Sequence, residues 1–464
     1  MFAGLLGALL SGSASLLQAQ TYPTPQHPKS YSVLALGTSL KVGVTQNGVY
    51  RITYEDLVSA GLVSQPLSAR KLAIYGNVSG YLPFFNTADI YDDLAALPFS
   101  VYDPNQDGMF GPGDYLVFYA QSQARATYQA QSGTFSVTIN PYCDTTYYFV
   151  GIQAEYVPEI PVETASAEAS APQIEVFPDY VHHEQELYNV CEGGATWLGE
   201  RFMSGGASHN INITLPGAVR GNTASAYVRT AARTASGTAS FTLRTGEKTQ
   251  SVYLSKNEAC TQFAETTLDF PVSDEKTTFS FLYNKESSAG EGYLDKITVS
   301  YNRRLAFSSG SLNFRAPQGI SEDVRFRIES SRELRVWDVT DIYNLREMQV
   351  SASGNHREFS AKADNSLHEY TVFEASTCPK PRFVGLVQPQ NLHAERNIDY
   401  VIVSHPSFVE QAQKIARIHR EKDGYTTLVT TTQKVFNEFS SGAKDPSAFR
   451  LLMKKLSDNS DSLR

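Results

Sequence analysis

Between residues 179 and 376, apolar and polar residues alternate in short runs separated by turn residues. Examples are "TASAYVRTAART" (223–234), "TASFTLRTG" (238–246) and "GYLDKITVSYNRRL" (292–305). Alternation with a period of two places every second side chain on one face of a strand, which a helix cannot do. Many short strands at this spacing predict an antiparallel sandwich. We therefore expect a jelly-roll-like β-sandwich over residues 179–378.

Length and composition fit a multidomain, mostly β protein. The chain has 464 residues, and 26 Tyr and 25 Phe favour strands. A net charge of -9 provides no basic surface, so we expect no nucleic-acid partner.

An N-terminal β-rich domain is expected over residues 21–154, and a Pro-, Ala-, Ser- and Glu-rich linker over 155–178. Asn47-Gly48 lies between two alternating runs and predicts a β-hairpin. Thr53 and Asp56 then form a capping box that begins a short helix.

Residues 1–20, "MFAGLLGALLSGSASLLQAQ", are typical of an export signal peptide. The stretch is apolar and uncharged, and a small residue, Ala19, precedes the expected cut. A short membrane anchor is the alternative, but Gly and Ser interrupt the apolar run. We expect the protein to be exported.

The pattern changes near residue 395. "IDYVIVSH" (398–405) is a continuous apolar strand, and Pro406 and Gly424 mark the start and end of a helix. A second apolar strand and further helical segments follow, and strand–helix–strand–helix order predicts a parallel α/β sheet. Only two strands are present, so we expect residues 379–464 to be the incomplete start of an α/β domain.

Residues 103–114, "DPNQDGMFGPGD", follow nearly the spacing of a calcium-binding loop. Calcium prefers hard oxygen ligands on a tight turn, and Gly108 supplies the turn. The predicted ligands are Asp103, Asn105, Asp107, the carbonyl of Met109, and Asp114. Position twelve of the loop is Asp rather than Glu, and Pro112 prevents the helix that follows an EF-hand loop. A Ca2+ bound here would therefore be structural. The alternative is a polar hairpin turn without an ion.

The sequence shows no complete catalytic site. The four cysteines (Cys143, Cys191, Cys260 and Cys378) lack zinc-ligand spacing; they form up to two disulfides or are buried thiols. His182 and His183 are adjacent and would face opposite sides of a strand, so they cannot easily share a metal ion. Cys378 precedes the first parallel strand, away from the edge where a nucleophile is expected.

Several segments resemble the gingipain family of caspase-like cysteine peptidases. Two are specific to its peptidase domain: "QPQNLHA" (388–394) and "NEFSSGAKDPSA" (437–448). Upstream segments are similar to one branch of that family, the sortase-like signal peptidases of type IX secretion. These are "VYDPNQDGMFGPGDYLVFYA" (101–120), "ELYNVCEGGATWLGERF" (186–202), "GYLDKITVSYNRRL" (292–305) and "VWDVTDIYNL" (336–345).

The resemblance implies a caspase-like fold for the α/β domain and a cell-surface protein associated with the bacterial outer membrane. It also implies a cysteine endopeptidase and transpeptidase that removes the C-terminal sorting domain of secreted cargo and joins the cargo to anionic lipopolysaccharide. Its partners would include outer-membrane attachment-complex proteins. No position here matches the catalytic His or Cys of the family, so we expect this chain to be inactive by itself. The alternative is a calcium-stapled surface-binding or adhesion module without enzymatic activity.

Overall fold

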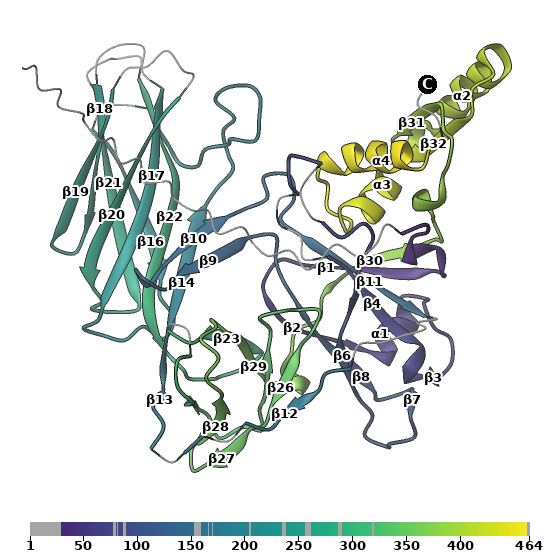
Figure 1. Cartoon of the computed structure of the whole chain (residues 1–464). Coiled ribbons are helices and arrows are strands. Elements are labelled where there is room, and N and C mark those ends of the chain that lie inside the picture. The colour runs from purple at the N-terminus through teal and green to yellow at the C-terminus, as the bar shows by residue number, and fades with distance from the viewer. Residues whose placement is uncertain are drawn as a thin grey trace, which may run out of the picture.

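The computed structural model describes residues 29–461 except 78–79, 81, 87–89, 153–158, 166, 169, 204–205, 234–237, 256–260, 286–289 and 318–319. The predicted export signal at residues 1–20 lies outside the described residues. The protein is mostly β, as predicted (Figure 1). Its buried side chains form four main cores. Among the described residues, no helix is long and apolar enough to span a membrane.

The first β-unit has two sheets that face each other. One has the order β30 (Arg382–Val387), β1 (Ser39–Val44), β11 (Thr146–Ile152), β4 (Leu72–Tyr75) and β5 (Ala96–Leu97). The other has the order β2 (Gly48–Thr53), β8 (Tyr115–Ala120) and β6 (Phe99–Tyr102). Smaller elements are α1 (Tyr54–Ser59), the pair β3 (Leu67–Ser68) and β7 (Met109–Phe110), and the hairpin β9 (Arg125–Gln129) and β10 (Thr134–Thr138).

The hairpin predicted at Asn47-Gly48 is wrong, because β1 and β2 pair in different sheets. The chain crosses from one layer of the first β-unit to the other at this point. Gly48 is needed for a close approach, since a Cβ there would lie 2.5 Å from the Ser311 hydroxyl oxygen. The capping box is confirmed: Thr53 and Asp56 exchange both capping hydrogen bonds at the start of α1.

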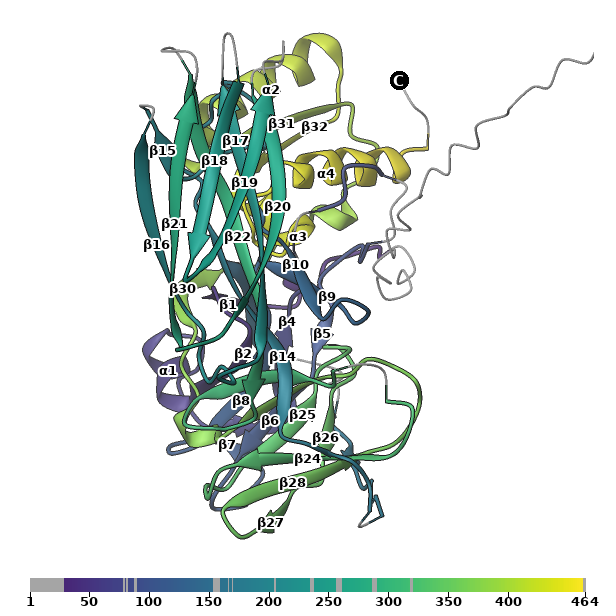
Figure 2. The same cartoon turned by 90° about the vertical axis from the view of Figure 1, so that its left-hand side faces the viewer.

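The jelly-roll unit is the long sandwich that faces the viewer in Figure 2. One sheet contains β14 (Val176–Glu184), β22 (Glu291–Arg304), β17 (Thr223–Arg233) and β20 (Gln262–Pro271), with β15 (Arg201–Phe202) beside β22. The facing sheet contains β16 (Ala207–Thr214), β21 (Lys276–Lys285), β18 (Thr238–Thr245) and β19 (Lys248–Ser255). Inward-facing residues of both sheets form one core, as the alternation predicts.

A third β-unit lies below the jelly roll in Figures 1 and 2. One of its sheets has the order β12 (Val162–Glu163), β26 (Arg346–Met348), β25 (Arg335–Asp338), β29 (Glu369–Phe373) and β23 (Ser311–Arg315). The other has the order β13 (Gln173–Ile174), β24 (Val324–Glu329), β28 (His356–Ala361) and β27 (Ser351–Ser353). The structure thus divides the single sandwich predicted over 179–378 into two units with separate cores. Both units have the same alternating pattern, so the sequence does not mark their boundary. Part of the predicted 155–178 linker supplies the edge strands β12 and β13.

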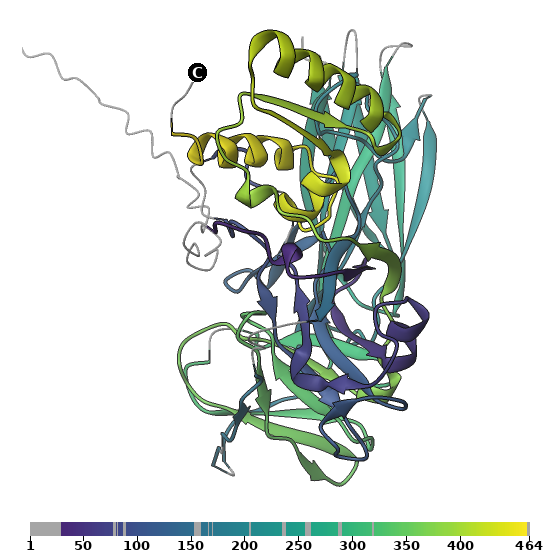
Figure 3. The ribbon, with the colours of Figure 1, turned by 90° about the vertical axis from the view of Figure 1, so that its right-hand side faces the viewer.

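The α/β segment (residues 390–461) has two parallel strands, β31 (Tyr400–Ser404) and β32 (Thr427–Thr431). Its helices are α2 (Val409–Asp423), α3 (Thr432–Phe439) and α4 (Ser447–Asp458), and Gly424 ends α2 in the left-handed conformation, as predicted. The segment lies over one end of the first β-unit (Figure 3). Residues 382–387, predicted to begin the α/β domain, instead form β30 at the edge of the first β-unit.

Candidate functional site

The carboxyl ends of parallel strands are where α/β proteins usually place their chemistry. At the end of β31, His405 is exposed, and its Nδ1 accepts a hydrogen bond from the Ser407 amide at 3.2 Å. At the end of β32, the Thr431 hydroxyl accepts from the Lys434 amide and begins α3. The segment contains no cysteine. Both strand ends therefore begin helices, and neither presents a nucleophile beside a base.

Cys378 belongs to the core of the first β-unit and not to the α/β segment. Its side chain is 3% exposed, and burial raises the pKa of the thiol to about 12. A thiolate is the nucleophilic form of cysteine, so this residue stays protonated and unreactive at neutral pH. The sequence-based placement of Cys378 away from the strand ends agrees with this position.

The strongest polar cluster joins the two gingipain-like segments, 388–394 and 437–448. His393 and Glu438 are fully buried, and His393 Nδ1 lies 2.6 Å from the Glu438 carboxylate. The same carboxylate accepts hydrogen bonds from the backbone amides of Leu392 and His393 and from the Gln390 side chain. Glu438 thus accepts hydrogen bonds from the amide groups of a tight turn. These bonds in turn compensate the carboxylate for the loss of its hydration on burial.

The His393 ring also reaches the first β-unit. Its Nε2 lies 2.7 Å from the carbonyl oxygen of Asp92, which can only accept a hydrogen bond. With a carboxylate on Nδ1 and a carbonyl on Nε2, the geometry favours a doubly protonated ring. Burial alone would lower the pKa of His393, but the hydrogen bond to Glu438 and the charge of Asp93 outweigh burial and raise it.

Lys41 of β1 makes a second contact between the first β-unit and the α/β segment. Its ammonium group donates to Asn437 Oδ1 at 2.9 Å and to the Gly442 carbonyl at 3.1 Å, and it lies 4.1 Å from the centroid of the Tyr147 ring. Burial lowers the pKa of Lys41 to about 8. Gly442 has a φ of 83°, and a Cβ there would lie 2.6 Å from the Lys41 nitrogen. Only glycine allows this approach without displacement of Lys41.

Two further polar residues of 437–445, Ser441 and Asp445, also bond to the first β-unit. The Ser441 hydroxyl donates to the Tyr147 carbonyl and accepts from the Asn77 amide, each at 3.1 Å. Asp445 accepts from the Leu82 amide at 3.2 Å. We call residues 437–445 the docking loop, because its buried polar side chains serve this contact. In the sequence, the resemblance alone marks this run; the signal for its buried contacts is the group of polar residues beside an apolar helix.

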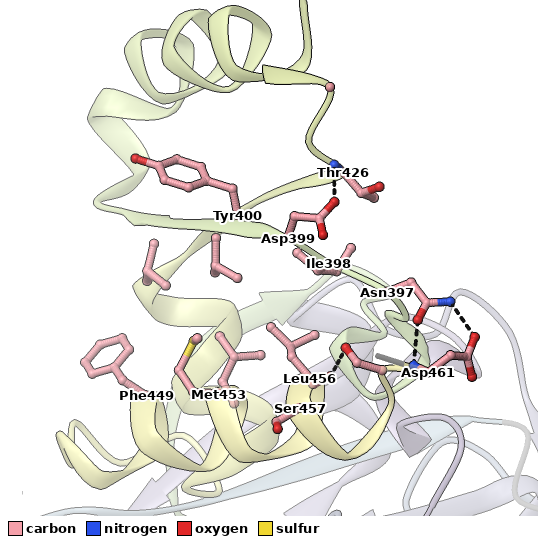
Figure 4. Close-up of a pocket in the computed structure, with 15 residues that line it drawn as sticks. Asn397, Ile398, Asp399, Tyr400, Thr426, Phe449, Met453, Leu456, Ser457 and Asp461 are labelled. Atoms are coloured by element: carbon pink, nitrogen blue, oxygen red, sulfur yellow. Dashed lines mark hydrogen bonds between the residues drawn. The ribbon is translucent and has the colours of Figure 1, made fainter. Parts of the chain in front are cut away.

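A groove of about 930 Å3 lies between β31 and α4 (Figure 4). Its strand side includes Val401 and Val403, and its helix side includes Phe449, Leu452 and Met453. Met453 remains 53% exposed although it faces the strands. Hydrogen bonds from Thr426 to Asp399 and between Asn397 and Asp461 fix the groove's polar end.

In the predicted calcium loop, the carboxylates form hydrogen bonds within the loop. Asp103 accepts a hydrogen bond from the Gly108 amide at 2.9 Å. Asp107 accepts hydrogen bonds from the Met109 amide at 2.8 Å and from the Asn105 side chain. Asp114, which is buried, accepts a hydrogen bond from the Gly111 amide. The described residues contain no group of three or more His, Cys, Asp or Glu side chains placed to hold one ion. One observation fits a cation: Asp103 Oδ1 is buried and accepts no hydrogen bond.

The other predicted features are placed as follows. His182 bonds to Glu184 and His183 to Glu200, so the two adjacent imidazoles have separate partners. Cys143 and Cys378 are free thiols, whereas Cys191 is disulfide-bonded. Cys260 lies outside the described residues.

Comparison with known proteins gives two informative similarities. The sequence pattern of peptidase family C25 matches residues 393–464. Dimeric latent PorU from Porphyromonas gingivalis superposes with a TM-score of 0.79 and 25% identity over 94% of this chain and 41% of that chain. The chain therefore spans about two fifths of the length of that PorU chain.

Other similarities carry no weight. A CBM36-1 domain of a xylanase from the hindgut metagenome of Trinervitermes trinervoides has 12% identity and a TM-score of 0.19, over 26% of this chain and 96% of that domain. The sugar-binding EclA C-terminal domain has 12% identity and a TM-score of 0.18, over 29% of this chain and 81% of that one. No curated protein matched the chain.

The two informative similarities agree with the geometry. The family match begins at His393, whose Nε2 contacts the Asp92 carbonyl of the first β-unit. The PorU likeness extends through all four units, and it includes the β-units that hold this segment. The chain is thus similar to PorU over nearly its whole length, and its residues 393–464 match the sequence pattern of peptidase family C25.

Proposed function

We propose that this chain is the amino-terminal part of a PorU-like sortase of type IX secretion, in which the β-units hold the first strands of the peptidase domain in place. The docking loop carries this proposal, since its buried polar groups find their partners on the first β-unit. A protein that had to place a cleft precisely would need such a rigid support.

In the complete protein, the proposed activity is removal of the C-terminal sorting domain of cargo, followed by attachment of the cargo to anionic lipopolysaccharide. The protein would act at the cell surface with outer-membrane attachment-complex proteins. The chemistry needs a thiolate to attack the carbonyl and a histidine to protonate the leaving amine. Cys378 cannot serve, because it is buried and protonated.

The 464-residue chain should therefore cleave no sorting-domain peptide, and Cys378→Ala should leave that result unchanged. Incubation with a purified cargo sorting domain, followed by mass spectrometry, measures both. A longer protein with further parallel strands, if the gene encodes one, is the positive control: it should process the cargo and lose activity when a later cysteine is replaced. Turnover by the 464-residue chain that Cys378→Ala abolishes would overturn the proposed inactivity.

The second candidate function is a calcium-stapled surface-binding or adhesion module. The unpartnered Asp103 Oδ1 favours the calcium part of this proposal. The residues that would hold Ca2+ are Asp103, Asn105, Asp107, the Met109 carbonyl and Asp114. The ion would neutralise the loop carboxylates and brace β6 against β7 and β8, which the loop connects.

Millimolar calcium should raise the melting temperature of the first β-unit by several degrees, and Asp107→Ala should remove the shift. The reason is that an ion bound only to the folded state stabilises it by mass action. Differential scanning calorimetry with calcium and with chelator measures the effect, and Asp144→Ala, at an exposed turn, is the matched control. Superimposable melting curves would leave the polar turn as the correct interpretation.

A further inference from the structure

The third β-unit contains a cavity of about 640 Å3 that none of the preceding functions uses. It lies beside the ends of β25 and β28 and the start of β29. Four carboxylates line it: Glu163, Asp338, Asp341 and Asp364. Acidic residues alone do not define a site, but a second observation lies at the same place.

That observation is Tyr370, which is 1% exposed and lines the cavity. Its ring packs among Phe314, Phe326 and Phe359, with centroids 5.1 to 5.5 Å apart. No hydrogen bond of its hydroxyl occurs among the described residues. Phenylalanine would fill the aromatic core equally well, so packing does not explain why this residue carries a hydroxyl. The hydroxyl presents a polar group without a hydrogen-bond partner to the cavity.

The charges of the lining do not balance. His368 lies between Asp338 and Asp364, at 2.7 and 2.8 Å, and these contacts raise its pKa to about 9, so it is positive at neutral pH. Arg346 pairs with Glu163. Lys362, the other cation of the lining, bonds to Asp323, which does not line the cavity.

Asp341 bonds only to uncharged donors, namely the Tyr343 amide and the Asn344 side chain. Asp341 therefore has no charged partner among the described residues, and the single positive charge of His368 balances only one of the two carboxylates that it contacts. Four carboxylates and three cationic side chains line the cavity, so one negative charge is in excess in the cavity that the Tyr370 hydroxyl faces. Such a lining attracts a cation.

Three kinds of ligand can be compared. A metal ion fits poorly, because the described residues contain no group of three His, Cys, Asp or Glu side chains around one point. A neutral sugar would leave the excess charge unbalanced. An organic cation compensates the charge, and its N–H groups can donate to the carboxylate and to the phenol oxygen.

We propose that this cavity binds an organic cation, the guanidinium or ammonium group of a basic side chain or a polyamine, at Asp341 and the Tyr370 hydroxyl. A polypeptide and a free amine share this chemistry, and the experiment below separates them. The site lies on the third β-unit, away from the α/β segment, so it does not depend on peptidase activity.

Isothermal titration calorimetry of the 464-residue chain tests the proposal with acetyl-Gly-Arg-Gly-amide and with spermidine. The matched control is the same peptide with citrulline, which has the shape of arginine without its charge. The arginine peptide or spermidine should bind saturably, and the citrulline peptide should bind at least about tenfold more weakly, since a hydrogen bond to a charged group is lost. Tighter binding of the peptide indicates a polypeptide partner, and tighter binding of spermidine a free polyamine.

Tyr370→Phe and Asp341→Asn should each weaken binding of the preferred cation about tenfold. Both changes keep the size of the side chain, and thermal melting verifies that each variant is folded. Asp274→Asn, which removes the same charge from an exposed position of the jelly-roll unit, should leave the affinity unchanged. Equal affinity for the two peptides where the arginine peptide binds saturably, absence of saturable binding by both the arginine peptide and spermidine, or unchanged affinity in both cavity variants would overturn the proposal.

Discussion

Glu438→Ala should loosen the turn that holds His393 against the first β-unit and lower the stability of the α/β segment by about 3–5 kcal/mol, the usual cost of removing one partner from a buried ion pair. The loss would leave His393 buried beside Asp92 and Asp93 without its carboxylate partner. It would also leave the Leu392 and His393 amides without an acceptor, because both donate to Glu438. Each effect destabilises the folded state, because buried donors without acceptors lose their hydration without compensation.

Hydrogen exchange measures this result residue by residue. The amides of Leu392 and His393 and those of α3 should lose protection, while strands of the jelly-roll unit keep theirs. Glu421→Ala, the same change at an exposed position of α2, is the matched control. Unchanged protection at Leu392 and His393 in Glu438→Ala would contradict the docking role.

The pH dependence gives an independent readout. Because the folded pKa of His393 is raised above its ordinary value of 6.5, its contribution is fully present below pH 6.5. That contribution is lost as pH rises through the raised value. Glu438→Gln removes one negative partner while keeping the size of the side chain, so the part of the pH dependence due to His393 should shrink in this variant, since Asp93 and the Asp92 carbonyl remain. A variant with the same pH profile as the wild type would show that another group is responsible.

Local features of the chain were predictable because their causes are local. Alternating side chains predict strands, the Thr53–Asp56 capping box predicts the start of α1, and Gly424 predicts the end of α2. Each depends on residues within one turn or one strand. The four-unit arrangement depends instead on which strands meet, and strand pairing between distant segments has no local signal.

The docking loop shows the same limit at the candidate site. Glu438 and Ser441 lie beside apolar helix positions, and nothing nearby in sequence explains their burial. Their partners include residues 45 and 294 positions away. The resemblance to a peptidase family identified the run, but only the structure shows that it supports the segment on a β-unit.

Trp337→Ala should lower the free energy of unfolding by about 3–5 kcal/mol and destabilise the first and third β-units together. Trp337 is on β25 of the third β-unit, yet its fully buried ring belongs to the core of the first. The ring lies 4.6 Å from that of Phe373, which belongs to the same core. Nearby, Arg335 reaches the Tyr102 hydroxyl on β6 at 2.9 Å. The two units therefore share packing that neither can supply alone.

Hydrogen exchange of β2 and β8, strands of the first β-unit, measures the coupling. Both should lose protection in Trp337→Ala, while β17 and β22 of the jelly-roll unit keep theirs. Trp337→Phe should cost much less, because it keeps most of the ring and removes a buried indole N–H that has no hydrogen-bond partner. Trp197→Ala, at the other tryptophan, which is 38% exposed, controls for loss of a tryptophan as such. If β2 and β8 keep full protection in Trp337→Ala while β25 and β29 lose theirs, the two units fold independently despite their shared core.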